Sequence, residues 1–502
     1  MARALVFVGF MGAGKSSAAR DAATRLGVEA LDADIAIERD AGASIAALFE
    51  RDGETGFRER EERVVLELLD AATDGQPVAL GGGALGSARV RDALRSHTVA
   101  LLEVSEETAW RRAQGGNRPL ARDRDRFSAL YAERQSAYES VADAFIAEGG
   151  REAVVQALPA LQELGRAEDG VQLAWATAAS GSYPVWFGAW PETQPDDVLI
   201  TDDHVVGAVL GERLAEVPRL TFPAGEEQKT LATAEALWRA LASRGATRRT
   251  RVVAVGGGVV GDLAGFVAAS YQRGIDVVHV PTTIVSQVDS AYGGKTGVDI
   301  PGGKNYVGAY HQPRAVHVLH DVLATLPAEE RAAGYAEVVK TALIAGGSLW
   351  ERVRSGGGEV DEAIVLACAR TKLRVVAADE RDGGLRQILN LGHTVGHAIE
   401  TVTAYARYRH GEAVALGLLA ALRLSGQDAL REEVGGLLAA AGLPTEMDAA
   451  IDPAAVAAAT RADKKRMGED TPFVLVRAPG EVVFGQHVAA ADLLAAVQEL
   501  AA

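Results

Sequence analysis

The sequence predicts an α/β protein with three parts: a parallel sheet with helices on both faces, a Rossmann-like α/β domain, and a mainly α-helical domain. Short apolar stretches alternate with helical stretches from residue 4 to about 145, and again from Leu173. Each half has a glycine-rich segment between an apolar strand and a helix, as parallel α/β domains do. From about Glu329, long stretches rich in Ala, Leu and Val favour helices.

The individual elements follow from these patterns. In the first half a helix is predicted from Lys15, with strands at Ala4–Val8, Val78–Leu80 and Val99–Val104. A polar stretch from Gly149 to Gly170 follows, and it contains one short helical pattern, Ala153–Leu164. In the second half, strands are predicted at Val198–Thr201, Val252–Val255 and Val277–Val280. The predicted boundaries are 1–165 for the first domain, 166–171 for a linker, and 172–328 and 329–502 for the two later domains.

The composition argues against nucleic-acid binding, disulfide bonds and a membrane-spanning segment. The 502 residues carry a net charge of −17, from 51 basic and 68 acidic side chains, and an acidic surface repels phosphate backbones, so nucleic acid is not expected as a partner. Cys368 is the single cysteine, so no intramolecular disulfide is possible. No signal peptide and no apolar run of about 18 residues is present. We therefore expect a cytoplasmic protein without a membrane partner.

The segment Gly9–Ser16 fits the phosphate-binding pattern G-x-x-x-x-G-K-[ST] and lies between a strand and a helix, as that motif requires. Its glycines let backbone N–H groups turn toward a phosphate. Lys15 would reach the β- and γ-phosphates, and the Ser16 hydroxyl would bind Mg²⁺. This predicts a P-loop that binds ATP with Mg²⁺ through Gly12, Gly14, Lys15, Ser16 and Ser17.

Further residues of this half suggest the phosphate acceptor. Asp32 suits the metal and Asp34 suits a hydroxyl. The triplet Gly81–Gly83 allows close approach of the backbone to a ligand. Arg134 and Tyr138 lie four residues apart on a predicted helix. A basic cluster resembles a lid over phosphates and comprises Arg111, Arg112, Arg118, Arg122 and Arg124.

Residues 1 to about 165 resemble shikimate kinase. The matching motifs are GFMGAGKS, the Asp-x-Asp pair, GFRxxE at Gly56–Glu61, the glycine triplet, the RPL segment that begins at Arg118, and Arg-x-x-x-Tyr. The resemblance implies ATP-dependent 3-phosphorylation of shikimate, with Lys15, Asp34 and Arg118 as catalytic residues. It also implies that shikimate is bound by Asp34, Arg58, Gly82 and Arg134, the two arginines holding its carboxylate.

In the second half, Gly256–Gly258 follows a predicted strand but departs from G-x-G-x-x-G, so by itself it is a weak dinucleotide signal. His393 and His397 are four residues apart and share a helix face. Glu337 and His410 are further candidate ligands, and three protein ligands with an open position suit catalytic zinc. Cationic and amide side chains beside glycines predict an anion pocket: Arg273, Lys295, Lys304, Asn305, Lys340, Lys372, Arg386 and Asn390.

From about residue 172 to 502 the chain resembles 3-dehydroquinate synthase, on GGGVVGDLAGFVAASYQRG, PTT, GGKTG, GKN, AGYAEVVK, LNLGHTVGHAIE and HGEAVALG. The resemblance implies zinc, or another divalent metal such as Co²⁺, on Glu337, His393 and His410 but not on His397. It implies NAD contacts from Asp202, Glu226, Lys229, Gly257, Gly258, Asp262, Thr282 and Thr283. It assigns the substrate to Arg273, Asp289, Lys295, Lys304, Asn305, Lys340, Lys372, Arg386, Asn390 and His397, with Lys295, Lys340 and His397 as catalytic residues.

The implied reaction converts 3-deoxy-D-arabino-heptulosonate 7-phosphate to 3-dehydroquinate with release of phosphate, and NAD is regenerated. Because the counterpart of Arg273 reaches a neighbouring subunit in that family, a homodimer is expected. Three departures from the family's pattern are Ala291–Tyr292 in place of Ser-Val, Asp299 in place of Asn, and His311 in place of Tyr. Lys464 or Lys465 is also expected to meet phosphate.

Three alternatives remain open at the level of sequence. The second half could be another sugar-phosphate cyclase, whose substrate might lack a carboxylate; Lys372 and Arg386 argue for an additional anion. It could be a polyol dehydrogenase, which needs fewer cations. One half could instead be a non-catalytic scaffold, against which the intact Lys15, Asp34 and Glu337 argue.

Overall fold

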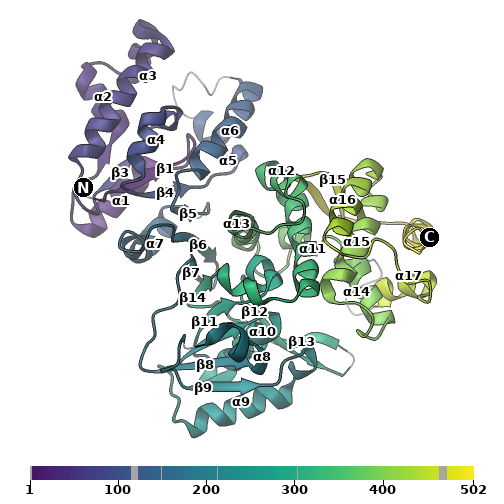
Figure 1. Ribbon diagram of the computed structural model, residues 1–502. Helices are drawn as coiled ribbons and strands as arrows, with labels where there is room; N and C mark the ends of the chain where they lie inside the picture. Colours follow the sequence, from purple (N-terminus) through teal and green to yellow (C-terminus); the bar gives the residue numbers. More distant parts are fainter. Residues whose placement is uncertain are drawn as a thin grey trace. The chain divides into compact units, whose positions relative to one another are not determined.

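A computed structural model of the chain describes residues 3–114, 123–148, 150–211, 213–301, 303–462 and 472–501. Its internal contacts divide the chain into two compact units, Met1–Ala189 and Trp190–Ala502, and each is described by itself (Figure 1). Within the described residues, none of the helices has both the length and the apolar character needed to span a membrane.

The first unit is built on a mostly parallel sheet. Its strand order is β2-β3-β1-β4-β5-β6-β7, and all neighbours are parallel except β6 and β7, which form an antiparallel hairpin. The strands are β1 (Leu5–Val8), β2 (Leu31–Asp32), β3 (Pro77–Ala79), β4 (Thr98–Leu102), β5 (Ala144–Ile146), β6 (Gln172–Ala178) and β7 (Gly181–Phe187). The strands β1, β3, β4 and β5 are buried throughout, as expected for a parallel sheet covered by helices.

Helices cover this sheet, and small side chains allow close packing. Ala18 and Ala22 of one helix share a core with Ala157 and Leu161 of another, over the strand residue Phe7. The helices are α1 (Lys15–Leu26), α2 (Ala33–Ala41), α3 (Ile45–Ala71, kinked at Gly53), α4 (Ala88–Leu94), α5 (Glu106–Gln114), α6 (Arg124–Glu139) and α7 (Gly150–Leu164), with the short 3₁₀ turn η1 (Ala84–Gly86).

The division by internal contacts lies after Ala189, whereas the sequence analysis placed the start of the second domain at residue 172. Residues from 172 were expected to belong to the second domain, after a linker at 166–171. In the structure the β6–β7 hairpin pairs with β5, with Leu173 opposite Ala144, and the contacts place the division after Ala189. The hairpin buries Leu173, Trp175 and Trp186 in the core of the first unit, which is why it groups with that unit.

The second unit begins with a parallel sheet of strand order β14-β11-β10-β8-β9. Its strands are β8 (Asp197–Asp202), β9 (Arg219–Phe222), β10 (Arg251–Gly256), β11 (Asp276–Pro281) and β14 (Ala315–Val318). The strands β12 (Lys295–Ile300) and β13 (Gly303–Tyr310) form a separate two-stranded antiparallel sheet. The accompanying helices and turns are α8 (Asp203–Val205), α9 (Leu231–Ser243), α10 (Gly258–Ser270), η3 (Val206–Leu210), η4 (Glu226–Gln228), η5 (Tyr271–Arg273), η6 (Ser286–Ser290) and η7 (Asp321–Thr325).

The rest of the second unit is mainly helical, as predicted from Glu329 onward. It contains α11 (Ala328–Ala345), α12 (Gly347–Ser355), α13 (Glu362–Ala378), η8 (Leu385–Asn390), α14 (His393–Val402), α15 (His410–Leu424), α16 (Asp428–Ala440), α17 (Pro453–Ala462) and α18 (Ala490–Gln498), with a hairpin of β15 (Phe473–Ala478) and β16 (Glu481–Gln486). Helices α11 and α15 are buried along most of their length and lie among the other helices (Figure 1). The polar side chains of Glu337 and Lys340 on α11 are therefore held in the interior.

Candidate active sites

The P-loop connects β1 to α1 and wraps around its lysine. Nζ of Lys15 donates to the carbonyl oxygens of Gly9 (2.8 Å) and Phe10 (3.1 Å). Gly12 and Gly14 have φ angles of +82° and +93°, a conformation that side chains with a Cβ rarely adopt. The loop thus places backbone N–H groups and the start of α1, with Ser16 and Ser17, around one concave turn, which suits a phosphate.

A second group of polar side chains gathers at the glycine triplet after β3. The carbonyl oxygen of Gly82 accepts hydrogen bonds from Nη1 of Arg134 (2.9 Å) and from the hydroxyl of Tyr138 (2.6 Å). A Cβ at Gly81 would lie 3.1 Å from Oδ1 of Asp34, and a Cβ at Gly83 would collide with the guanidinium of Arg58. The triplet therefore needs its glycines because charged side chains lie directly against the backbone. Asp34, Arg58, Gly82 and Arg134, which are distant in sequence, come together here.

Glu61 belongs to this group, although the sequence analysis gave it no role of its own. Its carboxylate lies 2.5 Å from Nη1 of Arg58, and the residue is 3% exposed. Burial raises the pKa of Glu61, and the neighbouring Arg58 guanidinium only partly opposes this. The i, i+3 spacing to Arg58 within GFRxxE was a usable signal, since such residues face each other on a helix.

In the structure, two other predicted residues of this half contact the protein backbone. One oxygen of Asp32 accepts a hydrogen bond from the backbone N–H of Asp34 (3.0 Å) and so caps α2. Arg112, which the sequence grouped with a lid, donates to the carbonyl oxygen of Gly12 (3.0 Å) and pairs with Glu148 (3.3 Å). It therefore supports the P-loop itself. Arg118 lies outside the described residues, as do Lys464 and Lys465.

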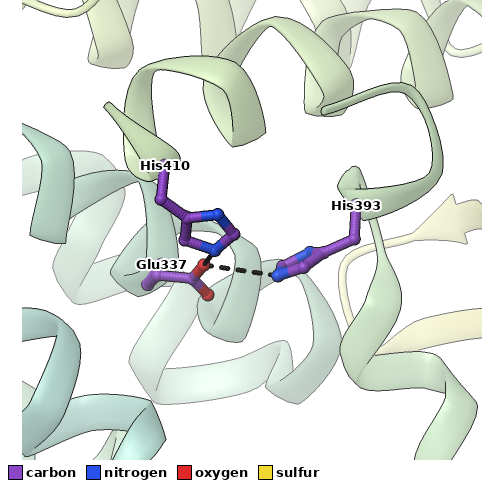
Figure 2. A group of neighbouring side chains, drawn as sticks. All are labelled: Glu337, His393 and His410. Atoms are coloured by element: carbon purple, nitrogen blue, oxygen red, sulfur yellow. Dashed lines mark ion pairs between the residues drawn. The ribbon is translucent and has the colours of Figure 1, made fainter. Parts of the chain in front are cut away.

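In the second unit, three side chains from three helices converge on one point. Oε1 of Glu337, on α11, lies 3.5 Å from Nε2 of His393, at the start of α14, and 3.3 Å from Nε2 of His410, at the start of α15. Figure 2 shows both imidazole rings directed at the carboxylate. The ligand atoms of these three residues lie within 4.8 Å of one another.

This arrangement fits a divalent metal. Glu337 is 1% exposed, and its Oε1 has no hydrogen-bond donor among the described residues. A buried carboxylate oxygen without a donor is costly, and a cation between it and the two imidazole nitrogens would remove that cost. Burial lowers the pKa of His393 to about 3, so its imidazole is neutral. Burial also acts to lower the pKa of His410, but Glu337 and Glu400 outweigh it and raise that pKa to about 10, so binding of a metal would release a proton from His410. Two nitrogens and one carboxylate with room for a further ligand are typical of catalytic zinc.

His397 stands beside the same group on the exposed side. Its ring centroid lies 5.3 Å from that of His393 and 5.9 Å from that of His410. With Glu400 and His410 it forms a second set whose ligand atoms lie within 4.8 Å of one another. His397 is exposed whereas Glu337 is buried, so His397 borders the open side of the group.

Two buried lysines and an aspartate adjoin the metal-binding group. Nζ of Lys340 lies 2.5 Å from Oε2 of Glu337 and 3.8 Å from Oδ1 of Asp289. Nζ of Lys372 donates to Oδ1 (2.8 Å) and to the backbone oxygen (2.6 Å) of Asp289. Burial raises the pKa of Asp289, but the two lysines outweigh it and hold the pKa at about 2. The cations are thus fixed in place by one ionised carboxylate.

The remaining predicted anion-binding residues flank this cluster in varied settings. Arg386 is 2% exposed and donates to the backbone oxygens of Glu380 and Gly293. Lys295 is half-exposed and pairs with Asp382. Lys304 lies 3.4 Å from Glu226 and has its Nζ 4.6 Å from the ring centroid of Tyr405. The other three are exposed: Arg273 at the end of η5, Asn305 in β13, and Asn390 at the end of η8.

The predicted dinucleotide residues lie at the carboxyl ends of neighbouring parallel strands, where α/β sheets bind ligands. Asp202 ends β8, Gly257 and Gly258 follow β10, and Thr282 and Thr283 follow β11. A Cβ at Gly257 would lie 2.9 Å from Cγ2 of Thr283, so that turn is closely packed.

A buried lysine organises the carboxylates of this edge. Nζ of Lys229 lies 2.8 Å from Glu226, 3.4 Å from Asp262 and 3.8 Å from Asp299. Burial raises the pKa of Asp262 to about 6, with Lys229 opposing the shift. Asp299 also accepts the backbone N–H of Asn305 (2.7 Å), so this departure from the family's Asn ties the strand β12 to Lys229 and to β13.

Tyr292, which departs from the family's sequence pattern, packs in the protein interior. The ring is fully buried, and its hydroxyl donates to the backbone oxygen of Gln287 (2.5 Å). Gln287 in turn donates to the backbone oxygens of Pro281 (3.1 Å) and Leu319 (2.7 Å). Tyr292 therefore braces η6, the turn that carries Asp289.

Comparisons with known proteins identify the family of each half of the chain. Family models match residues 219–333 as the N-terminal part and residues 334–466 as the C-terminal part of 3-dehydroquinate synthase. A 3-dehydroquinate synthase of Halorhodospira halophila is 43% identical over 333 residues, which cover 62% of this chain and 94% of that protein. One of Desulforamulus reducens is 38% identical over 348 residues, covering 63% and 97%. The chain belongs to the 3-dehydroquinate synthase family.

In front of its synthase part the chain carries a shikimate kinase domain, since the shikimate kinase family model matches residues 11–164. A shikimate kinase of Acinetobacter baumannii, solved in complex with shikimate, is 33% identical and covers 32% of this chain and 94% of that one, with a TM-score of 0.31. This synthase family member is therefore a phosphotransferase and a phosphate-eliminating lyase in one chain.

A solved 2-deoxy-scyllo-inosose synthase resembles the synthase part, with 27% identity, a TM-score of 0.58, and coverage of 65% of this chain and 99% of that one. Its structure contains carbaglucose-6-phosphate, NAD⁺ and Co²⁺. The curated relatives at 38–43% identity are 3-dehydroquinate synthases, so the alternatives of a different cyclase, a polyol dehydrogenase or a non-catalytic half are not favoured.

Proposed function

We propose that the chain phosphorylates the 3-hydroxyl of shikimate with ATP, and converts 3-deoxy-D-arabino-heptulosonate 7-phosphate to 3-dehydroquinate with release of phosphate. The observation that supports the second activity most strongly is the convergence of Glu337, His393 and His410 beside Lys340 and Lys372. It combines a metal-binding group with buried cations. The proposed location is the cytoplasm, where ATP and NAD are available.

In the kinase part, the proposed roles follow from the two polar groups of the first unit. Lys15 and the P-loop N–H groups bind the phosphates of ATP, with Mg²⁺ on Ser16 and Asp32. Arg58 and Arg134 hold the shikimate carboxylate, and Asp34 accepts a proton from the reacting hydroxyl. Glu61 keeps the guanidinium of Arg58 in place through its 2.5 Å contact. Catalysis then consists mainly of positioning and charge stabilisation.

In the synthase part, we assign NAD to the strand ends around Asp202, Glu226, Lys229, Asp262 and Thr283, and zinc, or Co²⁺ in its place, to Glu337, His393 and His410. When bound, NAD⁺ would accept and return a hydride, and the metal would polarise the reacting hydroxyl. The other side chains bind and orient the substrate. Lys340 and Lys372, held by Asp289, provide positive charge for its anionic groups.

The remaining synthase residues supply orientation and specificity. Arg386 is the cation best placed for a carboxylate, because it is buried and its guanidinium is already fixed by two backbone oxygens. His397, exposed beside the metal-binding group, is proposed to contact the substrate rather than the metal. Lys295, Lys304, Asn305 and Asn390 complete the anion-binding side chains. The substrate's own phosphate is proposed to take up the proton during elimination.

We further propose a homodimer formed through the synthase part. Arg273 is exposed at the end of η5 and has a positive φ angle of 70°, which turns the chain sharply at the surface. This residue would complete the partner subunit's site. Sedimentation analysis tests the proposal: a monomer at micromolar concentration with full synthase activity would contradict it.

Separate assays of the purified full chain test both activities. ADP formation that depends on shikimate tests the kinase, and phosphate release from 3-deoxy-D-arabino-heptulosonate 7-phosphate with NAD⁺ and Zn²⁺ tests the synthase. Both activities are expected from one polypeptide. Absence of either one from a folded, metal-loaded chain would refute the corresponding half of the proposal. Activity on a sugar phosphate that lacks the carboxylate would instead favour another cyclase.

A further inference from the structure

Glu400 is a buried carboxylate next to the metal-binding group that the proposed mechanism does not use. It lies on α14, is 4% exposed, and has Oε1 3.3 Å from Nδ1 of His410. The other nitrogen of that ring, Nε2, points to Glu337 at 3.3 Å. The imidazole of His410 is therefore held between two carboxylates, one at each nitrogen.

His393 is held differently. Its Nδ1 lies 3.1 Å from the backbone oxygen of Leu391, two residues earlier in the chain. That contact also leaves Nε2 facing Glu337. The two histidines thus have the same orientation toward the metal-binding point, but one is fixed by a neutral peptide group and the other by a carboxylate. A charged acceptor holds an N–H donor more strongly than a neutral one does.

The backbone fixes Glu400 in this position. Its own carbonyl oxygen accepts the N–H of Tyr405 (2.8 Å) and the hydroxyl of Thr403 (3.2 Å). The chain then returns, and His410 becomes the first residue of α15. A turn anchored on Glu400 therefore delivers the histidine that the side chain of Glu400 contacts. The contact does not depend on a flexible surface residue.

Glu400 could alternatively be a metal ligand itself, because it forms a set with His397 and His410. That role would require Nδ1 of His410 to bind one metal while Nε2 binds another. A neutral imidazole has one N–H donor and one acceptor nitrogen, so a bridging ring would have to lose both protons. The geometry favours a hydrogen bond at Nδ1 and metal binding at Nε2.

We infer that Glu400 is a positioning residue for the metal ligand His410. It accepts the Nδ1–H hydrogen bond, fixes the tautomer whose Nε2 lone pair faces the metal, and adds negative charge behind the ring. Outer carboxylates of this kind raise ligand basicity and metal affinity. The inference rests on the proposed zinc site, and it goes further by assigning a determinant of zinc affinity outside the ligand set.

The test measures zinc affinity of the full-length chain without substrate, by competition with a coloured chelator. Glu400→Gln keeps an acceptor oxygen but removes the charge, and Glu400→Ala removes both. We expect zinc affinity to fall about tenfold in the first variant and up to about a hundredfold in the second. Glu432→Gln, an exposed glutamate on α16, is the matched control and should bind zinc as the unchanged protein does.

The absorption spectrum of the Co²⁺-loaded chain provides a readout that a general loss of stability would not produce. The d–d bands of Glu400→Ala should shift from those of the unchanged chain, because the ligand His410 loses the charged acceptor at its Nδ1, and those of Glu400→Gln should shift less. If Glu400→Ala does not fold, the glutamine variant still decides the matter.

Three outcomes separate the possibilities. Unchanged zinc affinity in a folded Glu400→Gln would overturn the inference. Two zinc ions per unchanged chain and one in Glu400→Ala would show that Glu400 binds metal directly, which also overturns it. Failure of the unchanged chain to bind zinc would refute the proposed zinc site itself, and with it this inference.

Discussion

Nζ of Lys340 lies 2.5 Å from Oε2 of Glu337, one turn earlier on the same helix, and both side chains are 1% exposed. One carboxylate oxygen of Glu337 thus faces the lysine, and the other faces the two histidine nitrogens. Lys340 and a bound cation would compete electrostatically for Glu337, because like charges at this distance repel. Lys340 would therefore be coupled electrostatically to a metal ion held by Glu337.

This relationship predicts the effect of Lys340→Met. Synthase activity should be lost because the lysine proposed to bind the anionic substrate is missing. Zinc should bind more tightly because the lysine ammonium no longer competes with it for the carboxylate of Glu337. Without zinc the variant should be destabilised by about 3–5 kcal/mol, since a buried carboxylate loses its partner. Thermal unfolding with and without zinc measures both effects, and the stabilisation by zinc should be larger than in the unchanged chain.

Lys372→Met is the matched control for that experiment. Lys372 is also a buried lysine, but it pairs with Asp289 and not with Glu337. Its loss should reduce synthase activity without increasing zinc affinity. Equal changes of zinc affinity in the two variants would contradict the specific coupling between Lys340 and the metal.

The ligand assignment predicts different effects for the three histidines. His393→Ala and His410→Ala should lose zinc and synthase activity, because each removes a nitrogen that faces Oε1 of Glu337. His397→Ala should retain zinc but turn over slowly. Metal analysis of the three purified variants, together with synthase assays at saturating zinc, checks this. Loss of zinc from His397→Ala with retention in His410→Ala would show that the assignment is wrong.

Lys15→Ala should reduce kinase activity by at least about a hundredfold, the effect of removing one donor to a developing charge. Its Nζ also donates to Gly9 and Phe10, so the shape of the P-loop should be checked through binding of ADP with Mg²⁺. Synthase activity should be unchanged, because the synthase residues lie in the other unit. Loss of both activities in a folded variant would contradict independent sites.

Arg58→Ala should weaken shikimate binding by about 1.5–3 kcal/mol, the contribution of a hydrogen bond to a charged group, while ATP binding changes far less. Calorimetric titrations with shikimate and with ADP measure the two affinities separately. Arg63→Ala is the control, because Arg63 lies on the same helix but pairs with the exposed carboxylates Asp40 and Glu67. Unchanged shikimate affinity in Arg58→Ala would remove Arg58 from the acceptor site.

The pKa of Asp262, raised to about 6 by burial and opposed by Lys229, predicts a pH-dependent effect of Asp262→Asn. The ordinary value is 3.8, so above pH 6 the ionised group costs the folded state up to about 3 kcal/mol, and below pH 4 this cost disappears. Lys229 keeps Glu226 and Asp299 as partners. Asp262→Asn should therefore raise the unfolding temperature near pH 8, with a gain that shrinks toward pH 4. A gain that is constant with pH would contradict the shifted pKa.

The sequence by itself determined the local chemistry. The P-loop could be predicted because its glycines and Lys15 act through the backbone of one short segment, whose conformation depends on neighbouring residues. The strands β1, β8, β10 and β11 could be predicted because continuous apolar runs are typical of buried parallel strands. The helical character after Glu329 followed from composition in the same way, and the motifs gave both families.

Only the tertiary structure decided which distant residues meet. Spacing alone favoured His393 with His397, yet the oxygen of Glu337 lies between His393 and His410, which begin different helices. Nor did any local pattern reveal that Glu400 contacts His410, or that the 172–187 hairpin adds to the first sheet. Periodicity identifies the face of an element that is buried, but the partner across that face is set by how the elements pack, which depends on the whole chain.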